Sequence, residues 1–350
     1  MPRIRTVVAV AGAALLAKRA LHRRIRRSPL WPLPALEKPV SGRPRGRAMR
    51  LRIAGRTELA DGVVQLRLEG AHLPDWEPGA HLDVVLPSGL VRQYSLCGDV
   101  ADASAYTIAT RRHEDGRGGS REVHDELREG VEIEVRGPRN RFPLVSSHAY
   151  VFVAGGIGIT PILPMLYAAE ASGAEWRLLY GGRSRASMPF LDEIEKLGGS
   201  RVTVVPEDEA GLPDLAALFA GVPAAAAVYC CGPEPLMDAV AGVLPGGCTL
   251  HLERFTPAAS VEGNTAFEVE LRRSGRTLTV PADESVLEAV RKELPNTPYS
   301  CEQGFCGTCQ HRVLEGEIDH RDELLVDAER VDSMLICVSR ARGERLTLDL

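Results

Sequence analysis

The sequence predicts a multidomain protein with three folded domains: an antiparallel β-barrel, an α/β domain built on a parallel sheet, and a small α+β domain. Three observations support this fold class. Short strands separated by Gly, Pro and Asp come first, strands then alternate with helices, and a hairpin, one helix and a cysteine-rich loop end the chain. A length of 350 residues suits two to three domains, each able to bury its own core.

Charge divides the chain into a basic arm and an acidic body. Residues 1–50 hold 13 Lys and Arg and one acidic residue, a net charge of +12, whereas the rest has 29 basic and 46 acidic residues, a net charge of −17. The apolar run at 7–17 is shorter than the about 20 residues that span a bilayer, and a basic block follows it where a signal-peptide cleavage site belongs. Residues 1–28 therefore predict either a helix on an anionic membrane surface or a solvated extension. A proline-rich linker ends this 1–48 segment.

Residues 49–147 are predicted to form the barrel. Four short segments with strand patterns lie between turn signals, at 63–68, 81–86, 106–110 and 131–136. A further strand carries Arg92, Tyr94 and Ser95, which an ordinary amphipathic strand also explains. The glycine-rich residues 116–120 predict either a nest of backbone N–H groups that binds an anion or a flexible hairpin loop.

Residues 148–255 are predicted to form the parallel-sheet domain. Helices between parallel strands place a helical layer on each face of such a sheet. The polar segment 256–266 shows no periodicity and predicts a linker. The expected strands are 150–154, 176–180, 201–205, 226–230 and 250–255, and the expected helices are 161–172, 190–197, 214–219 and 234–244.

A glycine turn joins the first of these strands to the first helix, at Gly155, Gly156 and Gly158. Glycines let a dinucleotide approach the backbone, Thr160 is expected to cap the helix, and Pro161 suits its first turn. The third glycine of the GxGxxG fingerprint is absent. At the end of the second strand, where NAD-specific sites carry an acid, the chain has Arg183, Ser184 and Arg185. They suit a 2′-phosphate or are solvated loop charges, so NADH and NADPH both stay open.

Residues 267–350 begin with a hairpin and a helix at 285–294 and continue into a cysteine loop. Cys301, Cys306 and Cys309 follow the C-x4-C-x2-C spacing, and Cys337 lies in a distant apolar run, as in plant-type 2Fe-2S sites. Glycines 304 and 307 allow a tight loop to aim three thiolates. Zinc, disulfides or buried thiols are the alternatives. The remaining cysteines, 97, 230, 231 and 248, lack ligand spacing.

Taken in order, five features resemble the phthalate dioxygenase reductase and vanillate demethylase reductase family: Arg92-x-Tyr94-Ser95-Leu96, the 116–120 loop, Gly155 to Pro161, Cys231-Gly232-Pro233 and the cysteine loop. The resemblance covers about residues 51–350. It implies FMN in the barrel, NADH or NADPH in the second domain, and a 2Fe-2S cluster in a β-grasp-like ferredoxin domain at 267–350.

The resemblance also implies residue roles. Flavin contacts are expected from Arg92, Tyr94, Ser95, Ile108 and Thr110, with the FMN phosphate at Gly118, Gly119 and Ser120. Nucleotide contacts are expected from Gly155, Gly156, Gly158, Thr160, Pro161, Arg183, Cys231, Gly232 and Pro233. Glu253 and Phe255 would close over the flavin. Ser95, Thr160 and Cys231 would be the catalytic residues, and Cys301, Cys306, Cys309 and Cys337 the iron ligands.

The implied function is an electron-transfer reductase that takes hydride from NAD(P)H to FMN and passes single electrons through the cluster to a partner oxygenase. That partner would be a Rieske-type enzyme or a haem-thiolate monooxygenase. A net charge of −7 over residues 262–350 suits docking on a basic partner surface. The alternatives are a non-enzymatic redox sensor that binds a membrane or protein through the basic arm, and a flavin reductase whose cluster is structural. We expect a cytoplasmic protein, with the inner membrane face as an alternative, and no nucleic acid partner.

Overall fold

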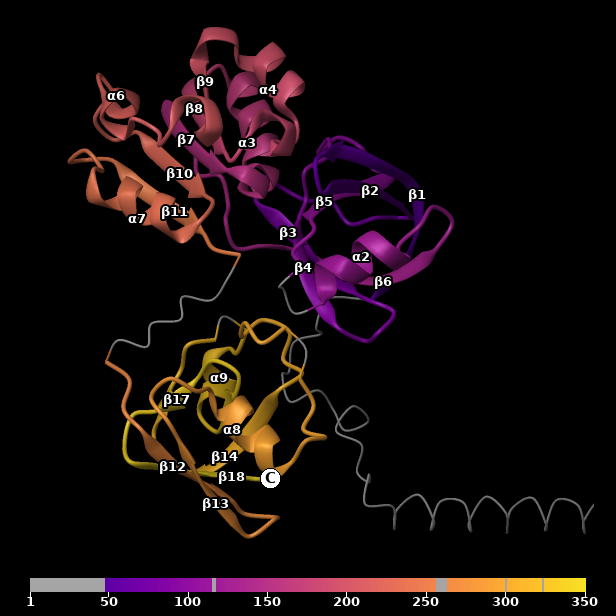
Figure 1. Cartoon of the computed structure of the whole chain (residues 1–350), viewed down its shortest axis with the longest axis vertical. Coiled ribbons are helices and arrows are strands. Elements are labelled where there is room, and N and C mark those ends of the chain that lie inside the picture. The colour runs from indigo at the N-terminus through magenta and orange to yellow at the C-terminus, as the bar shows by residue number, and fades with distance from the viewer. Residues whose placement is uncertain (1–47, 115–117, 256–262, 300, 323) are drawn as a thin grey trace, which may run out of the picture. The chain divides into compact units, whose positions relative to one another are not determined.

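The computed structural model describes residues 48–114, 118–255, 263–299, 301–322 and 324–350, which form three main sheets (Figure 1). The predicted membrane-surface helix within residues 1–28 lies outside these ranges, as do residues 116 and 117 of the predicted nest and most of the predicted linker. None of the helices in the described ranges has the length and apolar character needed to cross a membrane.

The first sheet is antiparallel and has six strands in the order β4-β3-β6-β1-β2-β5. The four strands predicted from residue patterns are confirmed; β6 extends beyond its predicted end because it continues to pair with β3. An apolar core lies against this sheet and includes Ile53, Leu66 and Leu82. The strands are β1 Met49–Ala60, β2 Val63–Glu69, β3 Ala80–Val85, β4 Val91–Ser95, β5 Ala105–Arg111 and β6 Glu132–Asn140.

Helix α2, Gly119–Glu126, follows the glycine-rich loop. The flexible-hairpin interpretation of this region is therefore wrong from Gly119 onward. Gly118 precedes the helix with a φ of 82°, a left-handed conformation that glycine adopts without strain. Val123 is fully buried in the core of the first sheet, and this packing stabilises a short helix that begins with a residue of low helix propensity.

The second sheet is parallel, with the order β11-β10-β7-β8-β9, and its predicted elements are confirmed to within about two residues at each end. Its strands are β7 Ala149–Gly155, β8 Glu175–Gly182, β9 Val202–Pro206, β10 Ala227–Cys231 and β11 Thr249–Glu253. Its helices are α3 Ile159–Ser172, α4 Leu191–Gly198, α5 Glu207–Ala210, α6 Leu215–Phe219 and α7 Glu234–Gly242, with short 3-10 turns at Gly156–Gly158, Arg185–Ser187 and Gly199–Arg201.

Both faces of this parallel sheet are covered, as predicted (Figure 1). Along β7, Phe152 faces the core formed with α3 and α4, whereas Val151 and Val153 face the core formed with α6 and α7. This alternation explains why the strand is apolar throughout: a strand buried on both faces needs an apolar side chain at every position.

The third sheet has five strands in the order β13-β12-β18-β14-β16, and β12 pairs in parallel with β18. The predicted hairpin is β12 with β13, and the predicted helix is α8, which begins with a capping box between Ser285 and Glu288. The elements are β12 Phe267–Leu271, β13 Arg276–Val280, α8 Val286–Glu293, β14 Gln310–Glu315, β15 Ile318–Asp319, α9 Asp327–Arg330, β16 Ser333–Leu335, β17 Arg340–Ala341 and β18 Arg345–Leu348.

Candidate functional site

Four cysteines converge in the third domain. Cys301, Cys306 and Cys309 lie in the loop between α8 and β14, and Cys337 follows β16. All four side chains are buried. The sulfur of Cys301 is within hydrogen-bonding reach of those of Cys306 and Cys337, and the sulfur of Cys309 is within reach of that of Cys337. Two segments that are distant in the sequence therefore bring four thiols together.

The loop backbone is shaped to surround this group of sulfurs. Gly304 and Gly307 have φ angles of 77° and 73°, which glycine adopts without a Cβ clash. The backbone N–H of Gln303 donates to the Cys301 sulfur at 3.3 Å, and that of Thr308 donates to the Cys306 sulfur at 3.5 Å. Hydrogen bonds of this kind stabilise thiolate ligands and tune the reduction potential of a cluster.

The proximity of the thiols changes their pKa values in opposite directions. The pKa of Cys301 is lowered, and the largest cause is the hydrogen bond from Cys306, followed by the one from Cys337. The pKa of Cys309 is also lowered, mainly by the hydrogen bond from Cys337. The donors, Cys306 and Cys337, have raised pKa values because they hold their protons in these bonds and are buried. Iron binding would displace the protons of all four thiols, and four converging thiols are the donor set that a 2Fe-2S cluster needs.

Among the residues that the structure describes, no three His, Cys, Asp or Glu side chains are grouped as they would be around one metal ion. The fit to a two-iron cluster rests on the four converging thiols.

At the first sheet, Arg92 of β4 lies against the beginning of α2. A Cβ built on Gly119 would be 2.5 Å from Arg92 Nε, so a larger residue here would displace the Arg92 side chain. The Ser120 hydroxyl accepts a hydrogen bond from the backbone N–H of His113 at 3.0 Å. The first backbone N–H groups of a helix lack intrahelical partners, and together with a guanidinium they suit a phosphate.

The other residues predicted to bind flavin lie on β4 and β5. Burial raises the pKa of Tyr94 to about 12, and its hydroxyl hydrogen-bonds the side chain of Thr110, which is itself buried. Ile108 is fully buried in the core of the sheet, so a cofactor could meet only its backbone. Ser95 is buried at the end of β4.

In the parallel sheet, the ends of β7 and β10 are adjacent, and chain order reverses between them. This is the point where open α/β sheets bind ligands. A Cβ on Gly158 would be 2.3 Å from the Cys231 carbonyl oxygen, and one on Gly155 would be 2.5 Å from Pro233 Cδ. The close approach of the two turns therefore requires glycine at these two positions and at Gly232, where a Cβ would collide with the opposite turn.

Thr160 does not cap helix α3, which corrects the prediction. The helix begins at Ile159, with Gly158 as its N-cap residue and no side-chain cap bond. Thr160 is buried within the first turn and its hydroxyl donates to the Ile157 carbonyl at 3.0 Å. Pro161 lies in the first turn, as expected, because a helix has no partner for a backbone N–H there.

Three of the predicted residues meet where the strands end. Ser95 donates a hydrogen bond to the Glu253 carboxylate at 3.4 Å. On the adjacent parallel strand β10, Cys231 is the register partner of Glu253 in β11. Burial, and then the charge of Glu253, raise the pKa of Cys231 well above its ordinary value, so its thiol stays protonated. Phe255, two residues further along the chain, is 41% exposed.

Arg111, at the end of β5, was missed by the sequence analysis. A Cβ on Gly156 would lie 3.2 Å from its Nη1 atom, so the guanidinium lies over the glycine turn. Arg111 and Arg183 both lower the pKa of His113, after the larger effect of burial, so positive charge gathers here. Arg183 itself is exposed, whereas Arg185 pairs with Glu209 at 3.1 Å. The Arg111-Arg112 pair at a strand end was the available signal.

Comparison with protein-family models matches residues 269–342 to the 2Fe-2S iron-sulfur cluster binding domain. The chain is 39% identical over 312 residues to the phthalate 4,5-dioxygenase oxygenase reductase subunit of Pseudomonas putida, covering 86% of this chain and 96% of the relative. It is 40% identical over 315 residues to the phthalate dioxygenase reductase of Burkholderia cepacia, covering 86% and 97% respectively. These matches extend over nearly the whole length of both relatives.

Two solved structures are similar to the fold. A phthalate dioxygenase reductase, described as a modular structure for electron transfer from pyridine nucleotides to a 2Fe-2S cluster, has a TM-score of 0.64 and 40% identity over 87% of this chain and 98% of its own. An intact type IV self-sufficient cytochrome P450 monooxygenase has a TM-score of 0.66 and 38% identity over 93% of this chain, which spans 44% of that longer protein. The chain thus belongs to the phthalate dioxygenase reductase family.

Proposed function

We propose that this protein is the reductase component of an oxygenase system, taking hydride from NAD(P)H to FMN and passing single electrons through a 2Fe-2S cluster to a partner oxygenase. The observation that carries the proposal is that Ser95, Glu253 and Cys231 meet at the strand ends of a chain that also brings four thiols together. When bound, the nicotinamide supplies two electrons together, and the flavin accepts them and releases them singly to the cluster.

For the flavin, we assign the phosphate to Arg92 and to the beginning of α2 at Gly118, Gly119 and Ser120. The close approach of Arg92 to Gly119 supports this assignment, because it places a cation beside free helical N–H groups. We assign the ring contacts to Tyr94, Ser95 and Thr110 and to the backbone at Ile108. The Tyr94–Thr110 hydrogen bond supports this role, since it orients the aromatic ring.

For the nucleotide, we assign binding to the two contacting turns, with Arg183 and Arg111 as cationic contacts to its phosphates. The Ser95–Glu253 hydrogen bond orients the serine hydroxyl and provides a place to hold a proton at Ser95 Oγ while hydride is transferred. Cys231 and Thr160, both buried, would border the nicotinamide and exclude water, and Phe255 would close over the flavin. The turns are Gly155, Gly156, Gly158, Thr160 and Pro161 on one side and Cys231, Gly232 and Pro233 on the other.

For the cluster, we assign Cys301, Cys306, Cys309 and Cys337 as the four iron ligands. Their burial, which shields a reduced cluster from oxygen, and the N–H bonds to sulfur support this assignment.

Two finer features of the fold are part of the proposal. Closure of the first sheet into a barrel is supported by the antiparallel bridge between Leu96 and Ile108, which links its two edge strands. A β-grasp form for the third domain is supported by helix α8 packed on a mixed five-stranded sheet. We place the domains at 49–147, 148–255 and 267–350, after a 1–48 extension and with a 256–266 linker.

The electron acceptor we propose is a terminal oxygenase or monooxygenase. The net charge of −7 on residues 262–350 favours docking on a basic surface, so electron transfer to the partner should slow as salt rises. The net charge of +12 over residues 1–50 likewise supports a proposed contact of the arm with an anionic membrane surface at the cytoplasmic face.

An anaerobic absorption titration of the purified, reconstituted protein tests the function. NADH is added to one sample and NADPH to another, and we expect the flavin bands to bleach before the cluster bands, at lower concentration of the preferred nucleotide. A protein that shows neither flavin nor iron–sulfur absorption after reconstitution would contradict the proposal. Bleaching of flavin without cluster bands would limit the function to flavin reduction.

A further inference from the structure

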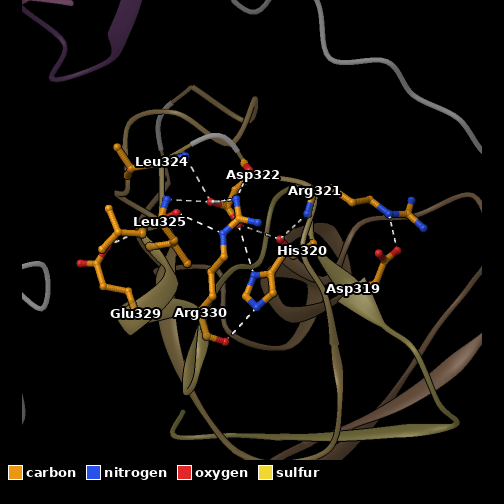
Figure 2. Close-up of polar contacts among 10 residues, drawn as sticks. Asp319, His320, Arg321, Asp322, Leu324, Leu325, Glu329 and Arg330 are labelled. Atoms are coloured by element: carbon orange, nitrogen blue, oxygen red, sulfur yellow. Dashed lines mark hydrogen bonds and ion pairs between the residues drawn. The ribbon is translucent and has the colours of Figure 1, made fainter. Parts of the chain in front are cut away.

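A buried carboxylate lies between the two segments that carry the cysteines. The side chain of Asp322 is 0% exposed, in the segment between β15 and α9. One carboxylate oxygen accepts hydrogen bonds from the backbone N–H groups of Leu324 at 3.1 Å and Leu325 at 2.8 Å. Figure 2 shows both N–H groups directed at the carboxylate.

Two basic side chains complete the surroundings of Asp322, and Figure 2 shows both directed toward it. Arg330 donates to the Asp322 backbone carbonyl at 2.8 Å and lies 3.7 Å from the carboxylate. His320 has one ring nitrogen 3.4 Å from the carboxylate and the other 3.0 Å from the carbonyl of Arg330. A buried charge with this many partners is held in one orientation, since each lost partner leaves a desolvated group.

The backbone of Asp322 touches the cysteine loop. A Cβ built on Gly304, between Cys301 and Cys306, would lie 3.2 Å from Asp322 Cα and 2.8 Å from Val338 Cγ2. The loop therefore rests directly on Asp322 and on the residue that follows Cys337.

The side chain of Asp322 also reaches the segment that carries the fourth cysteine. The Ser339 hydroxyl lies 3.5 Å from the other carboxylate oxygen and accepts a hydrogen bond from the Arg321 N–H at 3.3 Å. Ser339 is 1% exposed, and its N–H donates to the Leu335 carbonyl at 3.0 Å, closing the turn that contains Cys337.

We infer that Asp322 is a positioning residue for the iron–sulfur cluster: it fixes the distance between the cysteine loop and the Cys337 turn. This inference rests on the proposed cluster site. A cluster needs four thiolates at set positions, and three of them are on a different segment from the fourth. Asp322 meets one segment through its backbone at Gly304 and the other through its carboxylate at Ser339. Ligands held this way stay in place during electron transfer and give up iron slowly.

Three single variants of the full-length reconstituted protein test this inference. D322N removes the charge but keeps one oxygen for the backbone N–H bonds, and S339A removes the hydroxyl through which both the Asp322 carboxylate and the Arg321 N–H meet the Cys337 turn. D319N is the matched control, because Asp319 lies three residues before Asp322, at the end of β15, and its carboxylate pairs with the partly exposed Arg321. The measurements are the rate at which an iron chelator bleaches the cluster, its visible circular dichroism, and its reduction midpoint potential.

We expect D322N and S339A to lose iron at least about tenfold faster than the parent, a factor that corresponds to about 1.4 kcal/mol, with altered dichroism and a shifted potential. D319N should behave as the parent does. The double variant D322N/S339A should lose iron hardly faster than the more affected of the two single variants, because both changes act on the same junction between the segments. Flavin bleaching by nucleotide should be unchanged in all of them.

Several results would overturn the inference. One is iron loss and spectra in both S339A and D322N that match those of the parent. Another is an increase in iron loss in D319N as large as that in D322N. A third is a double variant whose iron-loss effect equals the sum of the two single effects. If D322N does not fold, S339A alone decides between the outcomes. A parent protein that binds flavin and nucleotide but no cluster would contradict the cluster assignment itself, which separates that failure from a failure of Asp322 to position the loop.

Discussion

The Ser95 hydroxyl donates a hydrogen bond to the Glu253 carboxylate across 3.4 Å, although 158 positions separate the two residues in the chain. One residue ends a strand of the antiparallel sheet and the other ends a strand of the parallel sheet. The hydrogen bond thus joins the proposed flavin site to the proposed nucleotide site.

Replacing Glu253 with Gln should slow flavin reduction by NAD(P)H about tenfold, the effect of about 1.4 kcal/mol on a barrier. The reason is that a charged acceptor orients the Ser95 hydroxyl more strongly than a neutral amide does. Anaerobic stopped-flow bleaching of the flavin measures the rate. E193Q is the control, because Glu193 is an exposed carboxylate that accepts a bond from Tyr167. Bleaching of E253Q at the parent rate would show that the pair has no part in hydride transfer.

Gly158→Ala should separate the two turns of the nucleotide site. Its Cβ would be 2.3 Å from the Cys231 carbonyl oxygen, a backbone atom that cannot rotate away. We expect a loss of about 1–3 kcal/mol in the free energy of unfolding, together with weaker nucleotide binding. Urea unfolding and a nucleotide titration measure the two effects. Gly242→Ala, whose Cβ would meet no atom within 4 Å beyond its chain neighbours and its own helix, should weaken neither, and equal losses in both variants would contradict the steric argument.

Cys337→Ser should separate flavin chemistry from electron delivery. The variant should bleach its flavin with NAD(P)H and reduce ferricyanide at the parent rate, while reduction of cytochrome c falls at least about tenfold. The reason is that a lost thiolate ligand removes the one-electron carrier and leaves the strand ends of the other sheets untouched. Cys248→Ser is the control, since this half-buried thiol is outside the site. Undiminished cytochrome c reduction in C337S would indicate that the cluster is only structural.

His81 should make the protein sensitive to acid. Its pKa is lowered to about 3, first by burial and then by the charges of Arg139 and Arg141. The unfolded chain binds a proton near pH 6.5 while the folded chain does not, so stability falls as pH drops from 6.5 toward 3. At pH 5 the loss relative to pH 7 is about 2 kcal/mol.

The comparison that isolates this effect is the shift in urea midpoint between pH 7 and pH 5, followed by flavin fluorescence. It should be smaller in H81Q than in the parent. In H148Q, which changes an exposed histidine, it should match the parent. Equal shifts in all three proteins would mean that another group causes the acid sensitivity.

Local patterns were sufficient to predict most elements of the parallel sheet. Each strand there is short and apolar and each helix follows a turn signal, so residues close in the sequence determine both. Helix α2 was missed because Gly118 and Gly119, which oppose helix formation, open it, and burial of Val123 in a distant core outweighs their low propensity.

The candidate site likewise has features that a local sequence pattern predicts and features that depend on how distant segments pack. The cysteine spacing was readable because three ligands lie within nine residues. The position of Arg111 over Gly156 and the bond from Ser95 to Glu253 depend on how separate sheets pack, and no local pattern records that. The residue type of Thr160 favours a cap, but α3 begins before it, at Ile159, and its hydroxyl donates back to the Ile157 carbonyl in the preceding 3-10 turn.

The contact between Gly158 and the Cys231 carbonyl has a consequence for engineering nucleotide preference. Because backbone meets backbone there, mutant libraries aimed at these two turns should yield mostly inactive clones. Arg183 is exposed on a loop and Arg111 is only partly buried at a strand end, so both tolerate other side chains. Saturation mutagenesis of those two positions is the economical route to exchanging NADH for NADPH in this scaffold.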